Sequence, residues 1–247
     1  RYLDSVVWED RGTLDDLLRA REIPLSKKLA GYYGIKTLRD SNRTAFPLYP
    51  SADLGRQGLF THPYLLANYS YPDQTSPIHR GVFVSRKILG RRLRPPKEAI
   101  SFKSSDFEPN WTMRQKVTAL TKPANCMACH DLINATGFLF EGYDATGRLR
   151  KKDGGGTIDT KVSYVDREGN KFLMNDPGDL LKHTLTSDES KIFFIEELFK
   201  YVAKQDPSCY KVMANETLFK DMKTNKLTDV YLQLCLEAAT DRFVYAP

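Results

Sequence analysis

The sequence contains no apolar run long enough to cross a membrane. A spanning helix needs roughly 20 consecutive apolar residues, and the richest run, residues 192–199, is short and includes two glutamates. We therefore expect no membrane span. The chain also lacks an initiator methionine and a signal peptide, which predicts a C-terminal piece of a longer polypeptide. The apolar side of Leu3, Val6 and Val7 is then expected to pack on that absent part or on another polypeptide.

Nucleic-acid binding is also not expected. The formal net charge is +6, and basic residues cluster between Arg86 and Lys97 and again between Arg148 and Lys152. Neither cluster is accompanied by stacking aromatic residues or by a helix-turn-helix pattern. The basic residues are therefore interpreted as a solvated surface.

Cysteine and histidine are scarce, with four of each in 247 residues, yet three of them fall in one pentapeptide, CMACH, from Cys126 to His130. Two thiols three residues apart share one face of a helix, where they can add to the two vinyl groups of a haem. His130 is then the proximal ligand of the iron. Zinc would need a second pair of ligands, and a thioredoxin-like pair would need a preceding strand; the sequence has neither. The motif predicts one covalent haem c.

Covalent haem attachment in bacteria takes place outside the cytoplasm, so a periplasmic or extracellular, exported protein is expected. The fold class expected is mainly α: a c-type cytochrome core with flanking helices and a small β-hairpin. Helical spacing is found over residues 1–35, near 62–69, 78–89 and 111–121, in the CMACH segment, and after Asp176. Alternation over Thr157–Val165, a turn at 167–170 and Lys171–Met174 predict the hairpin.

We expect three domains. Residues 1–50 form a helical tail of a preceding domain with its connector, residues 51–156 form the haem domain, and residues 157–247 form a small domain of hairpin and helices. Residues 36–56 are expected to connect, and Lys97–Asn110, after Pro95-Pro96, to be extended.

Between Gly55 and Arg150 the chain resembles the planctomycete-type cytochrome c proteins, on three phrases: GRQGLFTHPYLLANYS, TSPIHRGVFVSRKILG and CMACHDLINATGFLFEGYDATGRLR. The resemblance implies a haem c domain followed by a small C-terminal domain of unknown function, and no settled activity. The chain departs from the family pattern IDP-x-GF, because Asn134 and Ala135 stand where the family often has aspartate and proline. It also lacks a histidine shortly before Cys126.

The sixth iron ligand separates an electron carrier from a catalyst. His62 is predicted as the distal ligand because Pro63 would fix a helix start beside it; an ordinary histidine at a helix N-terminus is the alternative. Met174 is the main rival. The remaining candidates are His79, His183, Met113, Met213 and Met222.

Other cofactor contacts are expected from arginines and aromatic residues. Arg80, Arg148 and Arg150 are candidate partners of the haem propionates, because guanidinium matches carboxylate geometry; a solvent-facing role is the alternative. Phe138, Phe140 and Tyr143 would cover the porphyrin or belong to an ordinary core. Cys209 and Cys235 form either a disulfide or two separate buried thiols.

The function expected is one-electron transfer within a larger redox protein or assembly, with a redox partner protein. A haem enzyme, peroxidase-like or oxidative, with an open sixth position is the alternative. A third possibility is a structural or binding module in which the haem serves as a folding core. Whether the protein is an enzyme is left open by the sequence.

Overall fold

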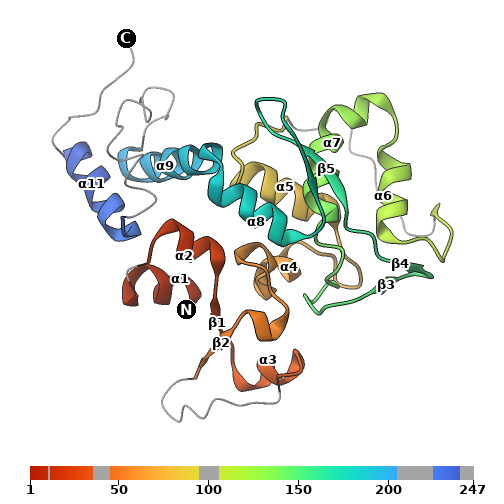
Figure 1. The fold of residues 1–247 in the computed structure, drawn as a ribbon, viewed down its shortest axis with the longest axis horizontal. Helices are drawn as coiled ribbons and strands as arrows, with labels where there is room; N and C mark the ends of the chain where they lie inside the picture. Colours follow the sequence, from red (N-terminus) through yellow and green to blue (C-terminus); the bar gives the residue numbers. More distant parts are fainter. Residues whose placement is uncertain (11, 36–44, 95–105, 205–224, 240–247) are drawn as a thin grey trace. The chain divides into compact units, whose positions relative to one another are not determined.

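The computed structural model describes the chain except for residues 11, 36–44, 95–105, 205–224 and 240–247, and it is mainly α-helical (Figure 1). Strands occur in the described residues only as two-stranded antiparallel pairs. The mainly α fold with a small hairpin is thus confirmed. Two compact units are formed, residues 1–59 with 183–247, and residues 60–182. The three predicted domains remain a prediction.

The first unit is built from short elements and two longer helices. Its N-terminal part contains α1 (Tyr2–Asp4), the π-helical turn η1 (Ser5–Glu9), α2 (Leu14–Arg19), β1 (Glu22–Pro24), α3 (Lys27–Tyr32), β2 (Leu48–Pro50) and the 3-10 turn η2 (Ala52–Leu54). Its C-terminal part contains α9 (Asp188–Ala203) and α11 (Leu227–Ala239). Helix α2 begins with a capping box, because Thr13 accepts from the backbone of Asp16 at 3.2 Å and the Asp16 carboxylate accepts from the backbone of Thr13 at 3.0 Å.

The helical pattern predicted over residues 1–35 is wrong at residues 22–24. These residues form β1, which pairs with β2 so that Ile23 lies opposite Tyr49. Pro24 explains the interruption, since it has no backbone N–H and its ring blocks a continuing helix. The partner strand β2 lies in the segment that was expected only to connect.

The second unit holds the CMACH motif, His62 and the predicted propionate and porphyrin contacts, whereas the candidate ligand His183 belongs to the first unit. Its helices are α4 (Pro63–Asn68), α5 (Pro77–Lys87), α6 (Met113–Thr121) and α7 (Ala124–Phe138), and its strands are β3 (Lys152–Asp153), β4 (Gly156–Thr157), β5 (Val162–Val165) and β6 (Lys171–Met174). The 3-10 turn η3 (Leu59–Thr61) and helix α8 (Pro177–Thr186) each cross a unit boundary. The helix starts expected near His62, Ile78 and Asp176 are all confirmed. The extended stretch predicted over residues 97–110 lies mostly outside the described residues.

Helices α5 and α7 cross at very short range. A Cβ atom built on Gly81 would lie 2.1 Å from the carbonyl oxygen of Ile133, and one on Gly137 would lie 2.0 Å from that of Pro77. The Thr136 hydroxyl lies 3.2 Å from the Gly81 carbonyl and 3.1 Å from the Ser85 hydroxyl. The two glycines therefore allow the backbones to meet, and the C-terminal half of α7 is fixed against α5.

The hairpin of β5 and β6 packs on α7. Val162 pairs with Met174, and Tyr164 pairs with Phe172. Val162, Tyr164 and Met174 are buried. This is the expected alternation of a strand with one face toward a core.

No helix in the described ranges is both long and apolar enough to cross a membrane, in agreement with the sequence.

Candidate functional site

The CMACH pentapeptide lies in the first half of α7. Cys126 and Cys129 are one helical turn apart, so their thiols share a face, and His130 follows directly. All three side chains are half-exposed, whereas residues 133–138 at the far end of the same helix are buried. The motif is thus presented on a helix that is anchored at its other end.

A chain of hydrogen bonds holds His130. Its Nδ1 atom lies 3.2 Å from Oδ1 of Asn134. The Asn134 amide nitrogen donates to the Thr121 hydroxyl oxygen at 2.9 Å, and that hydroxyl donates to the Val117 carbonyl at 2.8 Å. Asn134 and Thr121 are both buried. The position of the imidazole is therefore tied to the preceding helix, α6.

The donor and acceptor roles in these bonds determine which ring nitrogen of His130 carries the proton. The single Thr121 proton is used on Val117, so its oxygen accepts from the amide nitrogen of Asn134. Asn134 must then present its carbonyl oxygen, which only accepts, to the imidazole. The Nδ1 atom of His130 consequently carries the proton, and Nε2 of the neutral ring keeps its lone pair.

A buried ionic cluster fixes the segment that follows α7. The Glu141 carboxylate accepts from Arg150 at 2.8 Å and from the Thr75 hydroxyl at 3.0 Å, and it lies 4.0 Å from Arg80. Burial raises the pKa of Glu141 to about 7, and the guanidinium groups of Arg80 and Arg150 act in the opposite direction. Burial also lowers the pKa of Arg80 to about 10. Arg150 continues the cluster to Asp153 at 2.8 Å.

The candidate propionate partners have different surroundings. Arg80 is 3% exposed. Its two terminal nitrogens donate over 2.8 to 3.1 Å to the carbonyls of Leu66, Phe140, Tyr143 and Asp144 and to the Ser70 hydroxyl. These N–H groups are already hydrogen-bonded within the protein, and no contact supports Arg80 as a propionate partner. Arg148 is exposed in a turn, where its backbone N–H donates to the Asp144 carboxylate at 2.9 Å.

His62, the predicted distal ligand, lies at the N-cap of α4 and is half-buried. Its Nδ1 atom accepts a hydrogen bond from the backbone N–H of Tyr64 at 3.2 Å, and Pro63 is the first helical residue. An accepting Nδ1 places the proton of a neutral ring on Nε2, the atom that would otherwise bind iron. The capping role weighed for His62 is therefore present, and ligation stays a prediction.

The other predicted residues are distributed through the unit. Phe138 and Tyr143 are buried, and the Arg114 guanidinium lies 4.8 Å from the Phe138 ring centre. Met174 is fully buried beneath the hairpin and Met113 is buried at the start of α6. His79 is exposed beside Tyr71, whose ring centre lies 5.2 Å away. Met213, Met222 and Cys209, and with Cys209 the proposed disulfide, lie outside the described residues.

In the described residues, the side chains that commonly bind metal ions do not gather at one point. Within the described ranges no three His, Cys, Asp or Glu side chains are grouped so that they could hold an ion. Cys126, Cys129 and His130 instead lie along the helix.

Three residues of this region were not foreseen as site residues. Asn134 was noted only as a departure from the family pattern, and neither Thr121 nor Glu141 was singled out. The spacing of Asn134, four residues after His130 on one helix face, is the signal that could have indicated its contact. No sequence signal joins Thr121 or Glu141 to their distant partners.

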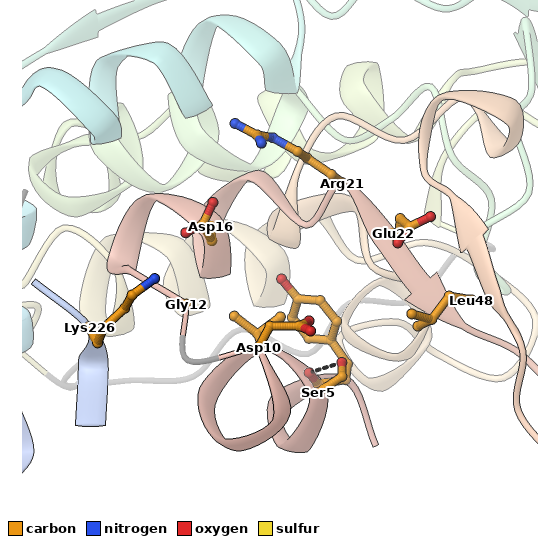
Figure 2. A pocket seen from close by; sticks show the side chains of 10 residues that line it. Ser5, Asp10, Gly12, Asp16, Arg21, Glu22, Leu48 and Lys226 are labelled. Atoms are coloured by element: carbon orange, nitrogen blue, oxygen red, sulfur yellow. Dashed lines mark hydrogen bonds between the residues drawn. The ribbon is translucent and has the colours of Figure 1, made fainter. Parts of the chain in front are cut away.

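A cavity in the other unit carries no comparable chemistry. It has a volume of about 280 Å³ and is lined by residues of α1, η1 and α2, by the first residues of β1 and β2, and by Lys226 (Figure 2). Its polar groups brace the first helices: Ser5 donates to the Tyr2 carbonyl at 2.9 Å, and the Tyr2 hydroxyl donates to the Leu17 carbonyl at 2.6 Å. Backbone and side-chain hydrogen bonds from Thr13 hold the pKa of Asp16 below its usual range.

The second unit is therefore a small, mainly helical domain that presents a CxxCH helix braced by buried polar contacts. Residues 56–153 match a protein family described as "PSCyt3: Protein of unknown function (DUF1588)". The match covers about two fifths of the chain and supports a planctomycete-type cytochrome-associated domain there. It agrees, at this level, with the resemblance seen between Gly55 and Arg150. Neither a curated protein nor a solved structure matches the chain.

Proposed function

We propose that this protein binds one haem c through thioether bonds to Cys126 and Cys129, with His130 as the proximal iron ligand. It would transfer single electrons as part of a larger redox protein or assembly, in the periplasm or outside the cell. A bound haem supplies the one-electron redox centre. The match of residues 56–153 to a cytochrome-associated family supports this class of function.

The state of His130 is the observation that carries the proposal. Its Nδ1 proton is engaged by Asn134, so Nε2 is the ring atom with a free lone pair, as an axial ligand requires. The donor set also fits the group, because the two half-exposed thiols lie along α7 and do not converge on one point. Separate thiols suit two vinyl groups better than they suit a single ion.

The test is the mass of the denatured chain after expression with a haem-attachment system. One added haem is expected for the wild type and for Cys235→Ser, which removes a thiol outside the motif. The double variant Cys126→Ala with Cys129→Ala should carry none. An unmodified wild-type mass, or a zinc ion bound at the motif, would disprove the proposal.

A haem enzyme with an open sixth position is the second candidate, and the environment of His62 favours it. The capping bond to Tyr64 occupies Nδ1 and leaves the proton on Nε2. Replacing His62 by Ala should leave the ferric spectrum unchanged if His62 only caps α4. A change from low-spin to high-spin would identify His62 as the distal ligand and favour the electron carrier. Binding of carbon monoxide and reaction with peroxide by the wild type would favour the enzyme.

A further inference from the structure

The proposed function leaves open what fixes the imidazole beneath the iron. His130 is half-exposed at a point where the surrounding side chains do not enclose it. Its orientation depends on the contact that one ring nitrogen makes, because a histidine on a helix surface otherwise samples several rotamers. That contact is the 3.2 Å approach of Nδ1 to Asn134.

Asn134 is itself held in place by a hydrogen bond to Thr121. It is buried, and its amide nitrogen donates to Thr121, which is bonded in turn to the Val117 carbonyl. Inverting the amide would place its NH2 group against Nδ1 and its oxygen against the Thr121 hydroxyl, whose single proton is already donated to Val117, so one buried hydrogen bond would be lost. The loss of that bond favours the orientation in which Asn134 presents its oxygen to His130.

We infer that Asn134, supported by Thr121, is a positioning residue that selects the Nδ1-protonated form of His130 and sets the electron donation of its Nε2 atom. The predicted effect on the iron rests on the proposed function. The predicted tautomer does not, because it follows from the contacts of the haem-free chain.

The chemical character of Asn134 predicts the direction of its effect. An amide oxygen belongs to a neutral group, so it attracts the Nδ1 proton less strongly than a carboxylate would. The imidazole then donates less charge to a bound metal than a histidine paired with aspartate. A neutral partner thus favours the reduced state of the bound iron, and a charged partner at the same position would favour the oxidised state.

Four variants of the full chain separate this role from general packing. Asn134→Leu removes the acceptor, and Asn134→Asp replaces it with a carboxylate. Thr121→Val removes the hydroxyl that orients the amide, whereas Thr121→Ser keeps it. Thr136→Val is the matched control, because it removes a buried hydroxyl from the same helix that has no bond to His130.

The first readout needs no haem. Nitrogen-15 NMR of the haem-free chain at alkaline pH should show a protonated Nδ1 in the wild type, Thr121→Ser and Thr136→Val. Asn134→Leu and Thr121→Val should shift the population toward the Nε2-protonated form. An unchanged tautomer in both of these, or an equal shift in Thr136→Val, would overturn the inference.

The second readout is the reduction potential of the haem-loaded chain. Asn134→Asp should lower it and Asn134→Leu should raise it, while Thr121→Ser and Thr136→Val leave it unchanged. Equal potentials in all variants would overturn the inference while leaving haem attachment intact. If the wild type takes up no haem, the proposed function fails, and the NMR result alone decides whether Asn134 selects the tautomer. Should Asn134→Leu not fold, Thr121→Val supplies the tautomer readout and Asn134→Asp supplies the reduction potential.

Discussion

At the scale of single residues, the unusual feature is a carboxylate enclosed between two guanidinium groups. Glu141 is 2% exposed and Arg80 is 3% exposed. Removing one partner from such a pair leaves a buried charge without compensation, which costs about 3 to 5 kcal/mol. The cluster therefore stabilises the position of residues 141–153, the segment that follows α7.

The stability of the haem-free protein should reflect the pKa of Glu141, which burial raises from 4.5 to about 7. The folded state then holds the proton more tightly than the unfolded state, so this group's contribution to the free energy of unfolding falls as pH rises from about 4.5 to 7. Glu141→Gln should abolish that fall, which amounts to at most about 3 kcal/mol. Urea unfolding across this pH range measures it. The exposed Glu168→Gln serves as control, and identical pH profiles for wild type and Glu141→Gln would contradict the prediction.

A second prediction separates two of the three arginines that were considered as propionate partners. Arg80→Lys should lower the free energy of unfolding of the haem-free chain by about 3 kcal/mol, because an ammonium cannot reach the same set of acceptors. Arg148→Lys, in an exposed turn, should change it by less than about 0.5 kcal/mol. Chemical denaturation of both variants is the measurement. Similar effects would show that Arg80 is not a structural clamp.

At the scale of elements, the crossing of α5 and α7 determines where the CMACH helix stands. The contact is one of backbone against backbone at Gly81 and Gly137. It is reinforced by Thr136, whose hydroxyl bonds across to the other helix. Because the buried half of α7 is fixed in this way, the two thiols and the imidazole on its other half keep their positions although they are half-exposed.

Substitution of Gly81 by Ala should be strongly destabilising. The new Cβ atom would fall 2.1 Å from the Ile133 carbonyl oxygen, and relief requires the helices to separate, which we expect to cost about 3 kcal/mol. Gly31→Ala in α3 is the matched control, since nothing lies within 4 Å of that Cβ position. It should stabilise the chain by about 0.5 to 1 kcal/mol. Thermal unfolding of both variants checks the pair; a neutral Gly81→Ala would refute the close crossing.

The sequence predicted these elements to different degrees for physical reasons. Helix starts marked by Pro63, Pro77 and Pro177 could be predicted because proline and a preceding cap are local signals. The pairing of β1 with β2 could not, since three-residue strands carry no periodicity and their contacts lie far apart in the chain. The CMACH motif was visible from its spacing, and the four-residue spacing of Asn134 from His130 indicated that the two share a helix face. The contact of Asn134 with Thr121 on another helix had no such local signal.

At the scale of the whole molecule, the family match and the compact unit end at different places. The match ends at residue 153 and the predicted haem domain at 156, whereas the unit extends to residue 182. The difference contains the β5 and β6 hairpin, which packs on α7. Val162, Tyr164 and Met174 bury their side chains there. The hairpin is therefore part of the structure that supports the CMACH helix.

Two fragments test where the autonomous haem domain ends. Residues 60–186, which keep α8 whole, should unfold cooperatively and take up one haem. Residues 60–156 lack the hairpin, and loss of its three buried side chains, each worth about 1.5 to 3 kcal/mol, removes an amount comparable with the whole stability of a small domain. This shorter fragment should show no cooperative urea transition and little haem attachment, as measured by circular dichroism and mass spectrometry. Equal stability of the two fragments would place the domain end before the hairpin, where the family match ends.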